Sequence, residues 1–221
     1  MGYQQVRIPD GFSLFTVTFK EVGKDAFNIN GISVKNTDGS AFTANNQVFL
    51  QKMDAGGNYL DPSLNYRSSK GGWCNKSTLQ TDITLASGEA VCLSNITGEE
   101  KDLLVSGEVE LTPISKTFGD GYFLSGNMTP VKINMNDISV YYRTAPDADW
   151  QIFASNNQVF LQKMDKGGNY LDPTYNYRSG KNGWCNKSTL VTDITFEPGE
   201  SFCLNNISGF EIQLRFKKPI E

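Results

Sequence analysis

The feature that most constrains this chain is an internal duplication. Residues 45–98 recur as residues 156–209 at a constant offset of 111 positions, and 41 of the 54 aligned residues are identical. The shared core reads NNQVFLQKMD, then GGNYLDP, NYRS, GWCNKSTL and TDIT. A repeat this close predicts two copies of one folding unit, each with a core of its own.

The flanks extend the repeat over nearly the whole chain. Residues 10–12 resemble residues 120–122, and residues 32–34 match residues 138–140 at an offset of 106. The offset then rises to 111, so the second copy holds five extra residues before position 156. No Gly/Ser-rich or Pro-rich linker separates the copies, which favours a stiff junction. We predict two domains, residues 1–114 and 115–221.

Short alternating segments recur within each copy. Residues 15–19, 47–53, 79–85 and 103–112 read as strands, because apolar and polar or β-branched residues alternate in them. Turn residues separate these segments, and the best helix candidate, Glu99 to Leu104, is too short to change the class. The pattern predicts an all-β protein of two tandem homologous β-sandwich (or barrel-like) domains.

The composition argues against several functions. The net charge is −4 and no basic run exceeds two residues, whereas nucleic-acid binding needs a concentrated positive surface. No apolar stretch approaches the roughly 20 residues that span a bilayer. The chain has no His and no nucleotide or nucleophile-elbow motif, so we expect no enzyme and no cofactor. Glycoside hydrolysis, which needs only two carboxylates, is not excluded by the missing His.

Four cysteines are divided equally between the copies. An even count suggests one disulfide within each repeat and an oxidising, extracellular or cell-surface location. Cross-repeat or intermolecular bonds, and four reduced buried thiols in a cytosolic protein, are the alternatives. The residues are Cys74, Cys92, Cys185 and Cys203.

The segment around GGNYLDP has two interpretations. A calcium loop would draw carboxylates from Asp54 and Asp61, and in the second copy from Asp165 and Asp172. The acidic residues are few, however, and the alternate-position pattern of an EF-hand is missing. A hairpin turn explains the same residues, so we expect no metal. Five Asn-x-Ser/Thr sequons are glycan acceptors in a glycosylating host and turn residues otherwise, at Asn75, Asn95, Asn127, Asn186 and Asn206.

Aromatic residues near the Gly-Trp segments also have two interpretations. Exposed rings beside polar side chains would form a glycan platform in each repeat, and two platforms would give avidity on a polymer. Burial in the two cores is the alternative that we favour. The residues are Tyr59, Tyr66, Trp73, Tyr170, Tyr177 and Trp184.

The segments IPDGFSLFTVTF, GYFLSGNMTPV, NNQVFLQKMD, GGWCNKSTL and SGEAVCLSN give the chain a wider resemblance. It resembles a group of secreted, tandemly duplicated β-rich bacterial surface or matrix proteins. The resemblance covers nearly the whole chain and rests on turns and core aromatics. It implies export and a surface or matrix role, and it carries no catalytic residues.

Self-association is the function that the sequence favours. Strand-like segments lie at both ends of the chain and are suited to pairing head-to-tail between subunits, which would build fibres or a surface layer outside the cell. The partner would be a second copy of the chain, and the alternative is a polysaccharide bound by an adhesive module. The terminal strand residues are Tyr3, Gln5, Arg7, Ile212, Leu214 and Phe216.

Overall fold

The protein is all-β, as the sequence predicts. The computed structural model describes residues 2–21, 23–24, 26–54, 58–86, 88–109, 113–164, 169–181 and 183–217, without the side chains of residues 61, 62, 164, 172 and 173. Its regular elements are antiparallel strands and a few short 3-10 helices. Within these ranges no helix has the length and apolar character needed to cross a membrane.

Among the described residues the two repeats carry nearly the same succession of elements, except that β3 has no counterpart in the second repeat and β16 has none in the first. The first contains β1 (Gly2–Ile8), β2 (Gly11–Thr16), β3 (Phe19–Lys20), β4 (Ala26–Asn28), η1 (Ile29–Gly31), β5 (Ile32–Asn36), β6 (Asn45–Met53), β7 (Tyr59–Arg67), η2 (Ser68–Lys70), β8 (Gly72–Asn75), β9 (Thr84–Ala86), β10 (Ala90–Asn95) and β11 (Lys101–Val109). The second contains β12 (Ser115–Phe118), β13 (Gly121–Gly126), β14 (Ile133–Asn134), η3 (Met135–Asp137), β15 (Ile138–Arg143), β16 (Gln151–Ile152), β17 (Asn156–Met164), β18 (Tyr170–Arg178), η4 (Ser179–Lys181), β19 (Gly183–Asn186), β20 (Thr195–Phe196), β21 (Ser201–Asn206) and β22 (Glu211–Phe216).

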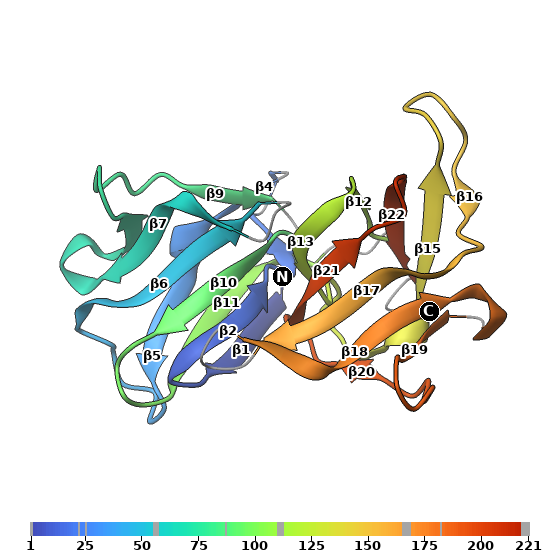
Figure 1. Ribbon diagram of the computed structural model, residues 1–221. Coiled ribbons are helices and arrows are strands. Elements are labelled where there is room, and N and C mark those ends of the chain that lie inside the picture. Colours follow the sequence, from blue (N-terminus) through green and yellow to red (C-terminus); the bar gives the residue numbers. More distant parts are fainter. Residues whose placement is uncertain are drawn as a thin grey trace.

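Each repeat has two main sheets. The five-stranded sheets run β2-β10-β6-β7-β8 and β13-β21-β17-β18-β19. Opposite them, β11 pairs with β1, β5 and β3 in the first repeat, and the second repeat has the order β12-β22-β15-β16. Figure 1 shows the repeats side by side, the first in blue to green and the second in yellow-green to red. The five residues added to the second copy lengthen the projecting β15–β16 hairpin.

Each repeat buries a separate core. Val48 and Leu50 of β6 alternate with outward residues and are fully buried together with Leu103 and Val105 of β11. Trp73 is also fully buried there, and its indole Nε1 donates to the carbonyl of Ile32 at 2.8 Å. Alternation along each strand therefore separates a core face from an outer face. Residues 114–216 supply the second core in the same way.

A polar contact fixes the Gly-Trp segment against η1. The backbone N–H of Trp73 donates to Oδ1 of Asn30 at 2.8 Å, and Trp184 makes the same bond to Asn136 at 2.7 Å. A Cβ on Gly72 would collide with that Asn30 oxygen. Glycine before each tryptophan is thus explained by close approach of the Asn side chain.

The intra-repeat disulfides expected from the sequence are wrong. All four cysteines are free, buried thiols. Cys74 lies on β8 and Cys92 on β10, and β7 and β6 stand between these strands. Three strand spacings amount to roughly 14 Å, whereas a disulfide needs Cα atoms within about 7 Å. The cysteine pairs therefore give no support to an oxidising compartment.

One predicted strand is shorter than the sequence indicates. The alternating run from Leu79 to Leu85 is a strand only in β9, because Leu79 adopts a left-handed conformation with φ of 57°. Asn75 holds that turn, since its Oδ1 accepts from the N–H groups of Ser77 and Thr78. The best helix candidate, Glu99 to Leu104, is not a helix, because residues 101–104 begin β11, which lies between β1 and β5.

A packed junction joins the repeats. Strand β13 lies against β2, β10 and β6, while β2 lies against β13, β17 and β21. The N–H of Thr16 donates to the carbonyl of Gly199 at 3.1 Å across this junction. Ile114 packs against the second core, one residue before the predicted start of the second domain. The outer faces of both five-stranded sheets are partly covered here by an apolar cluster of Phe12, Leu14, Met53, Ala90, Cys92 and Leu124.

Candidate functional site

The outer face of the first five-stranded sheet remains partly open beyond the junction. Strand alternation places Phe49 and Gln51 on this face, because Val48 and Leu50 point into the core. Ser94 is the cross-strand partner of both Phe12 and Phe49. A shallow depression of about 560 Å³ results, which we call the first platform, lined by Phe12, Phe49, Gln51, Ser63, Lys76, Ser77 and Ser94.

Tyr59 extends the first platform toward the junction. Tyr59 is 42% exposed, and its ring stacks on Phe12 with centroids 6.4 Å apart and planes 15° from parallel. The thiol of Cys92 donates to the Tyr59 hydroxyl at 3.6 Å. Burial of that hydroxyl raises the pKa of Tyr59 well above its usual value. The hydroxyl is therefore anchored at the junction while one part of the ring faces solvent.

Cations and hydrogen-bonding groups surround the rings. Nζ of Lys76 lies 5.7 Å from the centroid of the Phe49 ring and its side chain is exposed. Gln51, Ser63 and Ser94 are half-buried between the rings and supply amide and hydroxyl groups. Apolar ring faces bordered by donors and acceptors are typical of small-molecule and polymer binding surfaces.

The second repeat reproduces this arrangement. Tyr170 is 41% exposed and stacks on Tyr122 at 6.5 Å and 20°, and Nζ of Lys187 lies 5.5 Å from the Phe160 ring. The corresponding residues, which we call the second platform, are Tyr122, Phe160, Gln162, Thr174, Lys187, Ser188 and Asn205. The thiol of Cys203 donates to the Tyr170 hydroxyl at 3.7 Å, and burial raises the pKa of Tyr170 well above its usual value.

The structure places most of the candidate platform rings in the cores, which is the interpretation that the sequence favoured. Trp73 and Trp184 have no exposed surface, so neither ring can stack on a ligand. Tyr177 is 7% exposed, and Tyr66 is half-buried with its ring edge-on to Trp73. These rings fill the cores, as large side chains in a small sandwich do. Of the six aromatic residues, Tyr59 and Tyr170 lie at the surface.

The sequence reasoning missed most of the platform residues. No sequence motif marks the platform residues Phe12, Phe49, Gln51 and Lys76 as a site. Their signal was present, since Phe49 and Gln51 alternate with two core residues in β6. That alternation shows that a ring faces outward, but it does not show which end of the face the other repeat covers.

The remaining predicted sites lie elsewhere. Asp54 forms a turn, because its carboxylate accepts from the backbone and side chain of Asn58 at 2.8–3.3 Å. Asp165 and the side chains of Asp61 and Asp172 lie outside the described residues, and within those residues no group of three or more His, Cys, Asp or Glu is placed to hold a metal.

The terminal strands are engaged inside the molecule. In β1, Tyr3, Gln5 and Arg7 pair with Ser106, Leu104 and Asp102 of β11. In β22, which carries Ile212, Leu214 and Phe216, both edges are occupied, by β12 and by β15. Arg7 also forms an ion pair with Asp102 at 2.5 Å. Pairing of β22 with another molecule would therefore require one of its neighbours to leave.

Comparison with models of known protein families, with curated proteins and with solved structures finds no match to this chain.

Proposed function

We propose that the protein is a non-catalytic carbohydrate-binding protein with one aromatic platform in each repeat. One observation carries this proposal: both repeats place an exposed tyrosine stacked on a second ring, and a lysine ammonium over a phenylalanine ring. The C–H faces of a sugar ring are apolar and pack on aromatic faces, while its hydroxyls need hydrogen-bond partners. The platform supplies both.

A long polysaccharide is the ligand class that suits this geometry. Each platform is open and shallow rather than enclosed, so it suits a chain that lies across it. Two platforms on one rigid molecule allow two contacts with the same polymer, which raises the overall affinity without new chemistry. The free cysteines give no support to an extracellular location. A polysaccharide ligand outside the cell would instead be the reason for that location.

A role in binding rather than catalysis is supported by the side chains that are present. The chain has no His, and the described residues that line the first platform include neither Asp nor Glu. General acid–base hydrolysis of a glycosidic bond requires two carboxylates beside the sugar.

Binding to insoluble polysaccharides tests the proposal. We expect the protein to sediment with at least one of cellulose, chitin and xylan. Tyr59→Ala and Tyr170→Ala should each weaken binding by roughly tenfold or less, corresponding to about 1 kcal/mol for one lost ring contact. The double variant should bind far more weakly than either, because avidity is lost. Tyr3→Ala is the matched control, since Tyr3 is 64% exposed and lies on β1.

Two results would contradict the proposal. One is wild-type protein that binds none of the three polymers. The other is a double variant that keeps its thermal stability and still binds as the wild type does.

Self-association, which the sequence favours, stays a prediction. In the described chain β1 is at the edge of its sheet, whereas β22 is internal. Head-to-tail assembly would therefore use the outer edge of β1 and a partner other than an intact β22. Negative-stain electron microscopy with and without reductant checks this: filaments would support assembly, and discrete particles in both conditions would count against it.

A further inference from the structure

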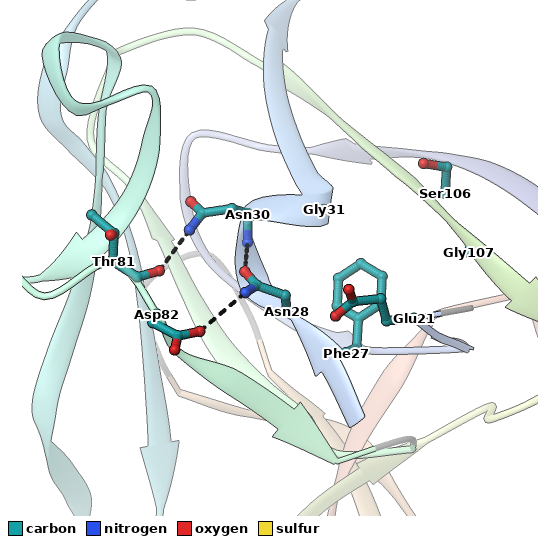
Figure 2. Close-up of a pocket in the computed structure, with 9 residues that line it drawn as sticks. All are labelled: Glu21, Phe27, Asn28, Asn30, Gly31, Thr81, Asp82, Ser106 and Gly107. Carbon is teal, nitrogen blue, oxygen red and sulfur yellow. Dashed lines mark hydrogen bonds between the residues drawn. The ribbon is translucent and has the colours of Figure 1, made fainter. Parts of the chain in front are cut away.

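The first repeat has a second hollow, on a different part of its surface from the platform. It is a pocket of about 600 Å³ between η1, the Thr81–Asp82 segment and the end of β11. Figure 2 shows Thr81 and Asp82 on one side of η1, and Ser106 and Gly107 on the other. Its volume lies within the range of small-molecule sites. The lining residues are Glu21, Phe27, Asn28, Asn30, Gly31, Thr81, Asp82, Ser106 and Gly107.

Hydrogen bonds hold the polar side of this pocket in place. Nδ2 of Asn30 donates to the carbonyl of Thr81 at 2.7 Å, and Nδ2 of Asn28 donates to Oδ1 of Asp82 at 3.4 Å (Figure 2). Oδ1 of Asn30 is bonded to the Trp73 backbone, so the core fixes this side chain. The side chain of Asp82 is exposed, and within the described part of the chain its second oxygen accepts no hydrogen bond. That oxygen is available to a ligand hydroxyl.

Glycine keeps the pocket open at its centre. A Cβ on Gly31 would lie 2.6 Å from the ring of Phe27, which is 2% exposed and lies beneath it. Ser106 occupies the position after Val105, whose register partner is Ile32, so residues 31 and 106 face each other across the two strands. Neither residue extends a long side chain into the space between them.

The second repeat carries different residues at the same positions. Asp137 replaces Gly31, Lys217 replaces Ser106 and Ile133 replaces Phe27. Nζ of Lys217 forms an ion pair with Oδ1 of Asp137 at 2.9 Å, which joins the two positions that face each other across the pocket in the first repeat. Asn134 and Asn136 still bond to Asp193 and Thr192, so the polar side is the same in both copies.

An insertion completes the pocket in the first repeat. Thr18 and Phe27 are nine positions apart, whereas the corresponding Met128 and Ile133 are five apart, so the first copy has four extra residues here. Glu21 lies in this insertion, and its carboxylate pairs with Lys24 at 2.7 Å. The two copies therefore share a scaffold, but the first has an extra wall and lacks the ion pair.

We infer that this pocket is a binding site for a single neutral sugar unit and that it is particular to the first repeat. Two carboxylates at the rim disfavour an anionic ligand. The carboxylate of Asp82, the amides of Asn28 and Asn30 and the hydroxyl of Ser106 together accept from and donate to a ring of hydroxyl groups. The ligand class follows from the polar groups of the pocket and is independent of the two platforms.

Nuclear magnetic resonance of the ¹⁵N-labelled protein tests the site. The probes are D-glucose, D-galactose and N-acetyl-D-glucosamine, added separately. At least one of them should shift the amide resonances of Gly31, Asp82 and Gly107 in a saturable manner. The variant Phe27→Ile/Gly31→Asp/Ser106→Lys places the residues of the second repeat in the first, and it should bind the same sugar at least roughly tenfold more weakly.

Two further variants keep the outcome unambiguous. Asp82 lies on an exposed segment, so Asp82→Ala should keep the fold. This variant should lower the affinity for the sugar even if the triple variant does not fold. Tyr59→Ala/Tyr170→Ala should leave these shifts unchanged, which separates the pocket from the platforms. The inference is overturned if none of the three sugars shifts these amides, or if Asp82→Ala binds as tightly as the wild type.

Discussion

Equivalent core positions of the two repeats hold side chains of different size, and the difference leaves a gap in the first. Tyr175 and Phe202 of the second repeat correspond to Leu64 and Val91 of the first. Phe202 packs edge-on against Phe196 at 5.2 Å. The first repeat has instead a largely apolar cavity of about 150 Å³, lined by Leu50, Gln51, Lys52, Leu60, Leu64, Ile83 and Val91.

Filling this cavity should stabilise the first repeat. Val91→Phe puts the ring of the second repeat into space that already exists, and we expect about 1 kcal/mol of added stability against urea. Phe202→Val is the matched reverse change and should cost about 2–3 kcal/mol, because it opens a cavity in a filled core. A destabilised Val91→Phe variant would show that the cavity walls cannot accept a ring without strain.

Strand β1 is expected to be essential for the first repeat. Ile8 is 2% exposed in the core, and β1 pairs along β11 from Gly2 to Ile8. Deleting residues 1–8 removes that residue and leaves one edge of a central strand unpaired, which costs more than a repeat of this size can lose. We expect the first repeat to unfold while the second, with its own core, stays folded.

The environment of each tryptophan reports this result. The Nε1–H resonance of Trp73 should collapse to an unfolded position in the truncated protein, while that of Trp184 should persist. A truncated protein with both resonances in place would mean that β1 is dispensable to the fold and free for other uses.

Alternation predicted individual strands well but not their neighbours. The segment 47–53 reads as a strand and is part of β6, because its core residues recur at every second position. Strand order is set by contacts distant in sequence, and β10 lies between β2 and β6. That order separates Cys74 from Cys92, which is why equal spacing in the two copies suggested a disulfide that the sheet does not allow. The left-handed turn at Leu79 likewise has no alternating signature.

The sites were harder to predict than the strands. Tyr59 and Trp73 look alike as candidates in the sequence, yet one lies at the surface and the other has no exposed surface. What distinguishes them is the face of the sheet, since Trp73 packs into the core of the first repeat and Tyr59 stacks on Phe12 on the outer face. The pocket of Figure 2 depends on Gly31. The importance of a glycine there becomes clear only from the second repeat, where Asp137 at the equivalent position pairs with Lys217.

At the scale of the whole molecule, the junction holds a half-buried cation. Lys116 of β12 donates to the carbonyl of Gly88 at 2.7 Å, and its Nζ lies 5.8 Å from the Phe118 ring. Burial lowers the pKa of Lys116 to about 8, while Glu89 raises it and Lys52 lowers it further. Glu89 and Lys52 are themselves paired at 2.6 Å. The charge of Lys116 therefore sits at the contact between the repeats, where burial outweighs the opposing effect of Glu89.

This lysine should make the stability of the protein depend on pH in a defined direction. Between pH 8 and the ordinary lysine value of 10.5 the unfolded chain holds a proton that the folded protein has released. Stability therefore rises with pH across that window, by on the order of 2 kcal/mol. The thiols act in the opposite sense, because burial raises the pKa of Cys92 and Cys203, so wild type must be compared with Lys116→Met. We expect urea unfolding at pH 7, 8, 9 and 10 to show the stability of the wild type rising relative to Lys116→Met. A constant difference between the two proteins would mean that Lys116 keeps its proton at the junction.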